Sequence, residues 1–235
     1  MRHVHPFALW GADHLTALGL VLAAIAALII VAPSLRRQQD LPLRRACALL
    51  LLANEAGSLA WAAAHGHVRV PLQLCDLAAF LTIWSLWSVQ PWACELAYFW
   101  GLAGSTQALL TPDLPWGFPD YWWIKFFATH GGVVIGVVYL AASGRVAPSG
   151  GSVWRVWLIT NGYVALAGIV NWLWGTNYGY LSHKPMHPSL LDAFGPWPWY
   201  ILAMDLAALG LFLLCYTPFI NHKEGRWQRA SARRS

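Results

Sequence analysis

The chain has 235 residues, of which 58% are hydrophobic and only 11% are charged, with 16 tryptophans and a formal net charge of +5. A soluble domain usually carries about a quarter charged residues, so this composition excludes an ordinary soluble protein and indicates a membrane protein without a separate soluble domain. In such a chain the basic excess is a signal of topology, and it gives no support to nucleic-acid binding.

Apolar segments of close to twenty residues recur along the chain, which is the length that a helix needs to cross a hydrocarbon core of about 30 Å. We predict an all-α membrane protein, a bundle of seven transmembrane helices formed by residues 1–222, followed by a basic cytoplasmic tail, residues 223–235. The expected spans are His14–Ala32, Ala46–Ala64, Pro71–Trp87, Trp92–Leu110, Trp122–Leu140, Trp154–Trp174 and Trp197–Phe219.

The lysines and arginines predict the orientation of this bundle. Four of them fall on the side of the N-terminus, namely Arg2, Arg69, Lys125 and Lys184. The other eleven fall on the opposite side, namely Arg36, Arg37, Arg44, Arg45, Arg145, Arg155, Lys223, Arg226, Arg229, Arg233 and Arg234. Because basic residues are enriched in cytoplasmic connections, we expect the N-terminus outside and the C-terminus in the cytoplasm.

Three carboxylates lie inside the expected spans. Glu55 and Asp205 fall near the middle of the second and seventh spans, and Asp76 falls about one turn inside the third. An ionisable group inside a bilayer is costly unless it is paired or solvated, so its default interpretation is functional. A hydrogen-bonded structural pair of Glu55 with Asp205 is an equal alternative.

The cysteines differ in depth. Three of them, Cys47, Cys94 and Cys215, fall near cytoplasmic ends of spans, whereas Cys75 falls near an outer end. Cys75 is therefore either a packing residue or a nucleophile, and a nucleophilic thiol needs a base because its free pKa is near 8.5. If Lys125 extends to the interface, His130 lies about 8 Å deeper, at a depth similar to that of Cys75. Both alternatives stay open at this point, since the sequence does not show whether the third and fifth spans touch.

Other polar residues have simpler interpretations. Asn161, Asn171, Ser105 and Thr106 are expected to join helices by hydrogen bonds, which is common in membrane bundles. His183 and His187 are four residues apart, a spacing that allows two histidines to bind one metal ion, but no cysteine or carboxylate cluster accompanies them. We predict no metal site and no cofactor.

Five blocks of the sequence resemble a known family. The blocks are Pro71–Asp76, Tyr98–Asp113, Phe126–Gly132, Asn171–Tyr180 and Gly195–Tyr200. In this order they resemble the YwaF-type bacterial integral membrane proteins, which are related to eukaryotic transmembrane protein 164. The resemblance covers the third to seventh spans and carries little of the first two.

The resemblance implies lipid chemistry in a bacterial inner (plasma) membrane. The eukaryotic relatives are cysteine-dependent acyltransferases that move a fatty acyl group between phospholipids and lysophospholipids, and their cysteine and histidine correspond to Cys75 and His130. One departure is Gln73, at a position where the family often has histidine. Since glutamine does not relay a proton as histidine does, we expect only a hydrogen-bonding role for it.

The hypothesis is therefore acyl transfer through a thioester on Cys75, with His130 as the base. Donors for the oxyanion would come from Gln107, Asn171 or Asn177, and Asp76, about 100° around the helix from Cys75, would orient a neighbouring helix. The alternative is a proton-coupled small-molecule transporter that uses Glu55, Asp76 and Asp205. A structural or assembly partner is a third possibility, whereas a retinal protein is disfavoured because the last span contains no lysine. The sequence does not indicate an oligomeric state.

Overall fold

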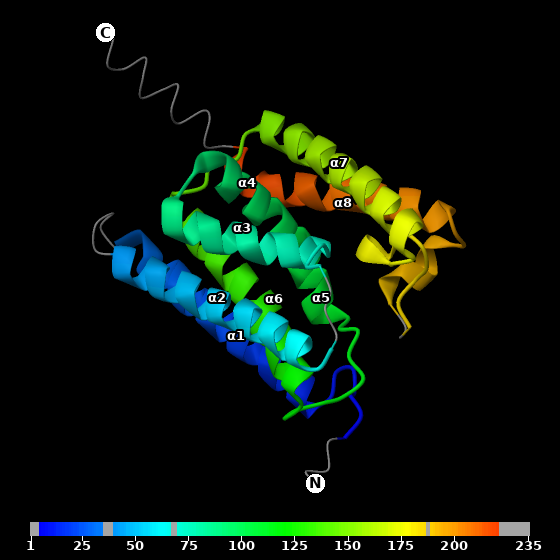
Figure 1. Cartoon of the computed structure of the whole chain (residues 1–235). Helices are drawn as coiled ribbons and strands as arrows, with labels where there is room; N and C mark the ends of the chain where they lie inside the picture. The colour runs from blue at the N-terminus through cyan, green and yellow to red at the C-terminus, as the bar shows by residue number, and fades with distance from the viewer. Residues whose placement is uncertain (1–4, 35–39, 67–69, 187–188, 221–235) are drawn as a thin grey trace.

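The structure is a computed structural model that describes residues 5–34, 40–66, 70–186 and 189–220. The regular secondary structure of the described residues is helical, apart from one isolated bridge between Pro6 and Trp116 (Figure 1). Its helices are α1 (Ala12–Val31), α2 (Leu41–Ala64), α3 (Leu74–Ser88), α4 (Pro91–Trp100), α5 (Thr106–Leu110), α6 (Tyr121–Ala142), α7 (Gly150–Trp174) and α8 (Trp199–Tyr216). The shorter turns are η1 (Ala32–Ser34), the π-helical η2 (Gly101–Ser105), η3 (Tyr178–Tyr180), η4 (Leu190–Phe194) and η5 (Thr217–Phe219).

The helices confirm the expected class of all-helical membrane protein. Five helical segments, formed by α1, α2, α6, α7 and α8 with η5, are long and apolar enough to cross a bilayer. The other two expected spans correspond to α3 and to the continuous segment α4–η2–α5. With 15 residues, α3 rises only about 22 Å, less than a hydrocarbon core of about 30 Å. The number of crossings and the orientation stay predictions, and the tail, residues 223–235, lies outside the described residues.

Consecutive helices alternate in direction, so the bundle has two distinct ends. We call the end at which α1, α3, α6 and α8 begin the loop end, because the long connection between α7 and α8 lies there. We call the other end, at which α2 and α7 begin, the arginine end. It contains Arg44, Arg145 and Arg155.

Helix α6 is the centre of the bundle, and 61% of its membrane-spanning window is buried. Three glycines let its neighbours approach closely. A Cβ atom added at Gly131 would lie 2.8 Å from Val21 of α1, one at Gly132 would lie 2.6 Å from Leu51 of α2, and one at Gly136 would lie 3.0 Å from Thr82 of α3. Small residues at such contacts are the usual means of close helix packing in membranes.

Helices α7 and α8 form a separate pair that packs against α4 and η2, and Figure 1 shows them diverging from α1 and α2. Asn161 of α7 donates to Asp205 of α8 at 3.1 Å, which confirms its expected role between helices. The expected pair of Glu55 with Asp205 is wrong, because the Glu55 carboxylate lies 3.1 Å from Lys125 on α6. The two carboxylates belong to different halves of the bundle.

An ionic cluster closes the arginine end. Asp40 is fully buried, and its Oδ2 atom lies 2.6 Å from Arg145, 3.3 Å from Arg44 and 2.5 Å from the hydroxyl of Tyr139. Arg44 also donates from Nη1 to the carbonyl of Leu86 at 2.7 Å, near the C-terminus of α3. The cluster therefore ties together α2, α3, α6 and the connection that follows α6.

Candidate functional site

Cys75 lies in the first turn of α3, and two side chains define where that turn begins. The backbone N–H of Gln73 donates to Asp76 Oδ2 at 3.2 Å, and the Gln73 side chain accepts from the backbone N–H of Asp76. This reciprocal cap satisfies two N–H groups that a helix start leaves without partners. Asp76 is buried and caps its own helix, a role that differs from the expected orientation of a neighbouring helix. Cys75 itself is half-buried.

Three donors hold the segment that leads into this turn. The hydroxyl of Tyr163 donates to the Leu72 carbonyl, the hydroxyl of Tyr178 donates to the Val70 carbonyl, and the N–H of Gly179 donates to Gln73 Oε1, each at 2.9 Å. We call this set of three contacts the tyrosine clamp. It fixes the position of Cys75 relative to α7 and η3, and it gives Gln73 the hydrogen-bonding role that the sequence predicts.

Asn171 and Asn177 shape the connection that carries this clamp. Asn171 donates to the carbonyl of Tyr178 at 2.9 Å and accepts from its N–H at 2.7 Å. Asn177 accepts from the N–H of Ser182 and donates to the carbonyl of His183, both at 2.9 Å. Both amides are used in holding the chain after α7, so the geometry gives neither of them the oxyanion role considered from the sequence.

Tyr180 extends the clamp toward the connection between α5 and α6. Its hydroxyl donates to Asp113 at 3.2 Å, and its carbonyl accepts from the hydroxyl of Tyr200 at 2.5 Å. Burial, followed by the neighbouring Asp113 carboxylate, raises the pKa of Tyr180. The phenol therefore keeps its proton at neutral pH and acts as a hydrogen-bond donor.

Helices α3 and α6 are in contact, and their contact sets the depth of Cys75 relative to His130. Thr82 of α3 faces Gly136 of α6, and both helices run away from the loop end. Cys75 lies seven residues from Thr82 in the direction of the loop end. Thr129, which precedes His130, lies seven residues from Gly136 in the same direction. Each interval corresponds to a rise of about 10 Å. Since seven residues complete nearly two full turns, Cys75 and Thr82 share one face of α3, and Cys75 also lies near Tyr163 of α7 and Tyr180 of η3. His130, six residues from Gly136, lies about 120° around α6 from the position that meets α3. A contact between the thiol and the imidazole stays a prediction.

The hydrogen bond of His130 to its own helix defines which ring nitrogen is a base. Nδ1 lies 2.8 Å from the carbonyl of Phe126, and the ring packs on the Phe126 ring with centroids 4.1 Å apart. A carbonyl oxygen only accepts, so Nδ1 carries the proton and Nε2 carries the lone pair. His14 is different, because it is fully buried and uses both nitrogens in bonds to Trp10 and Leu109.

A polar network joins α2 to α6 beside His130. Glu55 accepts from the hydroxyl of Thr129 at 2.5 Å and pairs with Lys125 at 3.1 Å, and Asn54 donates to Thr129 at 2.8 Å. The Lys125 side chain is only 11% exposed, so the expectation that it extends to the interface is wrong. Burial of both charges makes pairing with Glu55 the more favourable arrangement.

Ser105 is a site residue whose role the sequence did not reveal. It ends the π-helical turn η2, which packs against both α3 and α6. Its hydroxyl is buried and has no hydrogen-bond partner among the described residues. Gly101, one π-helical turn earlier, lies against Val133 and Val137 of α6. One turn along the same face leads to Ser105, which we therefore expect to face α6 nearer the loop end, at the level of His130. The expected hydrogen bond from Ser105 to another helix is absent from the described part of the chain.

The three carboxylates considered for a proton relay belong to three separate networks. Glu55 joins α2 to α6, Asp76 caps α3, and Asp205 joins α8 to α7. Gln107 is half-buried on α5. No group of three or more His, Cys, Asp or Glu side chains suited to a metal occurs among the described residues, and His187 lies outside them. The arrangement brings Cys75, His130 and Ser105 to one depth and leaves the carboxylates dispersed.

Comparison with known proteins gives one match. The sequence profile of the TMEM164 family matches residues 9–216, which include all of the helices α1 to α8; only the turn η5 among the described helical elements lies beyond the match. No curated protein and no solved structure matches the chain. The match extends through the first two helices, which carry little of the resemblance seen in the sequence blocks.

Proposed function

Because this chain belongs to the TMEM164 family, we propose that it is a membrane-embedded acyltransferase that moves a fatty acyl group between phospholipids and lysophospholipids. Cys75 is the nucleophile in this proposal and His130 is the base. The observation that supports it best is the register of α3 against α6. The approach of Thr82 to Gly136, extended by helical rise, supports a similar depth for Cys75 and His130 on neighbouring helices.

The hydrogen bond at Nδ1 supports the role of His130. With Nδ1–H donated to Phe126, the lone pair on Nε2 is available to accept the proton of a thiol. The same ring can return that proton to a leaving group in the next step. An imidazole held in one tautomer by a backbone carbonyl is the arrangement that a histidine base requires.

The proposed reaction has two steps. Nε2 of His130 takes the proton of Cys75, and the thiolate attacks the ester carbonyl carbon of a phospholipid. The carbon–oxygen ester bond breaks, the lysophospholipid oxygen receives the proton from His130, and the acyl group stays on Cys75 as a thioester. In the second step His130 takes the proton of another lysophospholipid hydroxyl, whose oxygen attacks the thioester carbonyl carbon. The carbon–sulfur bond breaks, the acyl group leaves as a new ester, and the Cys75 thiolate takes the proton back from His130.

Ser105 is the best-supported donor for the oxyanion of both steps. Its buried hydroxyl has no hydrogen-bond partner among the described residues and is directed to the level of His130. A buried hydroxyl without a partner carries a desolvation cost. A hydrogen bond from this hydroxyl would stabilise the substrate carbonyl oxygen as that oxygen becomes negative in the transition state. We assign Ser105 this role in preference to Gln107, Asn171 and Asn177.

The proposal includes a location. With the loop end outside, as the distribution of basic residues predicts, Cys75 would face the outer leaflet of a bacterial inner membrane. The lipid ester would then approach from that leaflet, near the tyrosine clamp.

Mass spectrometry of the intact purified protein after mixing with a phospholipid tests the nucleophile. We expect an acyl-sized mass increment on the wild type, its loss in Cys75→Ala, and its retention in Cys215→Ala, which removes another half-buried thiol from a different helix. Adding a lysophospholipid should discharge the increment and yield the acylated lipid. An increment that persists in Cys75→Ala, or transfer that continues without this thiol, would contradict the proposal.

A further inference from the structure

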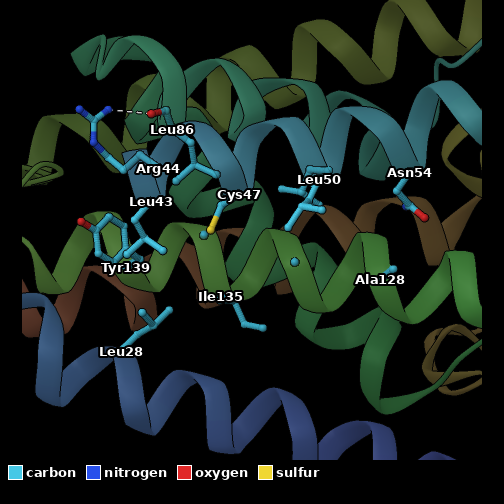
Figure 2. Close-up of a pocket in the computed structure, with 13 residues that line it drawn as sticks. Leu28, Leu43, Arg44, Cys47, Leu50, Asn54, Leu86, Ala128, Ile135 and Tyr139 are labelled. Carbon is cyan, nitrogen blue, oxygen red and sulfur yellow. Dashed lines mark hydrogen bonds between the residues drawn. The ribbon is translucent and has the colours of Figure 1, made fainter. Parts of the chain in front are cut away.

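A second apolar site lies on the other side of α6, between α1 and α2 (Figure 2). It is a groove of about 210 Å³ whose walls include Leu28 of α1, Leu43 and Leu50 of α2, and Ile135 of α6. Along α2 its lining runs from Arg44 to Asn54. The ten helical steps between these two residues correspond to a length of about 15 Å.

This groove is separate from the site of Cys75 and His130. Its α6 wall contains Ala128, Gly132, Ile135 and Tyr139, which recur at intervals of three and four residues and form one face of the helix. Ala128 and His130 are about 160° apart around the helix axis, since each residue advances about 100°. A molecule in the groove would therefore contact α6 on the side opposite the imidazole.

The two ends of the groove differ in charge. At the loop end, Asn54 already donates to Thr129 and to Glu55, at 2.8 and 3.3 Å. At the arginine end, Arg44 lines the groove (Figure 2) and shares the single carboxylate of Asp40 with Arg145, which lies closer to it. Arg44 Nε faces this carboxylate at 3.3 Å and Nη1 donates to the Leu86 carbonyl, whereas Asp40 Oδ1 has no hydrogen-bond partner among the described residues. Among the described residues, the cluster around Asp40 thus combines two guanidinium groups with one carboxylate.

From this geometry we propose that the groove binds one acyl chain of an anionic phospholipid, with the headgroup phosphate at Arg44. A buried guanidinium that shares its carboxylate is stabilised by a further anion. The apolar walls match an acyl chain, and their length of about 15 Å suits a chain that enters from the leaflet at the arginine end. Because this is the leaflet opposite to Cys75, the bound lipid is a resident ligand and is distinct from the substrate.

Lipid titration followed by native mass spectrometry tests the site. Phosphatidylglycerol and phosphatidylcholine with identical acyl chains are added separately to the purified full chain, and the fraction carrying one lipid is measured. We expect the anionic lipid to half-saturate the protein at a concentration about fivefold lower, the effect of about one basic residue on an anionic lipid. Arg44→Lys should keep this preference, and Arg44→Gln should abolish it.

A variant that fills the groove provides a test independent of Arg44, which also bonds to Leu86. Ile135→Trp should abolish the retained phosphatidylglycerol, whereas Leu158→Trp, on an exposed position of α7, should leave it unchanged. Thermal unfolding of each variant verifies its fold. Equal retention of the two lipids by the wild type, undiminished retention by folded Ile135→Trp, or a co-purified free fatty acid in place of a phospholipid would overturn the proposal. The measurement does not involve acyl transfer, so its result is independent of the reaction proposed for Cys75.

Discussion

The two ends of α3 are held by different kinds of contact. At the arginine end, the Leu86 carbonyl accepts from the guanidinium of Arg44, within the cluster around Asp40. At the loop end, the tyrosine clamp acts through neutral hydroxyl and backbone N–H groups. Charge-assisted hydrogen bonds are about twice as strong as neutral ones. We infer that α3 is anchored at the arginine end and is more adjustable at the end that carries Cys75. Substitutions at the arginine end should therefore affect stability, and substitutions at the other end should affect the reaction.

The largest effect should follow from breaking the anchor. Asp40→Asn removes the buried carboxylate shared by Arg44 and Arg145, and loss of one partner from a buried ion pair costs about 3–5 kcal/mol. We expect the free energy of unfolding to fall by this amount in a denaturant titration. The matched control is Asp192→Asn, because the Asp192 side chain is 56% exposed and lies 3.9 Å from Lys184, where an ion pair contributes about 0–1 kcal/mol. Equal losses in the two variants would contradict the assignment of the anchor.

At the opposite end, a change in the base should act on the reaction. His130→Gln removes the proposed general base, and a general base typically contributes about 10²–10⁴-fold to a rate. We expect acyl transfer to fall by this factor while the unfolding midpoint changes little. His65→Gln, which alters an exposed histidine near the loop end of α2, should leave the rate unchanged. A normal rate in His130→Gln would remove His130 from the proposed mechanism.

Ser105→Ala separates activity from stability. Loss of one oxyanion donor costs about 10²–10³-fold in rate, and we expect a loss of about 10²-fold here. Stability should stay constant or rise slightly, because the change removes a buried hydroxyl without a partner among the described residues. The control is Ser58→Ala, which removes a buried hydroxyl that donates to the Glu55 carbonyl at 2.9 Å and should lower stability by about 1 kcal/mol without changing the rate. The opposite pattern would make Ser105 a structural residue.

The smallest effect should come from loosening the tyrosine clamp. Tyr178→Phe removes the hydrogen bond to the Val70 carbonyl, which is worth about 1 kcal/mol. We expect faster hydrogen exchange of the amides around Gln73 and Gly179, with exchange at the arginine end of α3 unchanged. Tyr121→Phe, at a more exposed position of α6, provides the control. Exchange that increases equally at both ends of α3 would show that the ends are not held independently.

Much of the fold follows from hydropathy alone, because every expected span coincides with helical structure. Contacts between helices were harder to anticipate. The sequence does not predict the pairing of Glu55 with Lys125, because a lysine close to the end of a membrane helix is expected to extend to the interface. The segment from Gly101 to Ser105 has the sequence pattern of an ordinary apolar helix. Only the three-dimensional structure reveals a π turn whose Ser105 hydroxyl has no hydrogen-bond partner within the described ranges. Cys75 and His130 stay predictions that rest on depth and resemblance, since depth depends on helical rise and does not require knowledge of which helices touch.

The short length of α3 has a consequence for the surrounding lipid. Its 15 residues rise about 22 Å, roughly 8 Å less than the thickness of a typical hydrocarbon core. Since α3 is anchored at the arginine end, this deficit falls at the end where Cys75 lies. A bilayer adapts to such hydrophobic mismatch by thinning locally, which would draw ester groups of the facing leaflet down toward the thiol. The proposed acyl transfer, measured in bilayers of defined thickness, should therefore be faster with shorter-chain lipids, so membrane thickness itself would regulate this reaction.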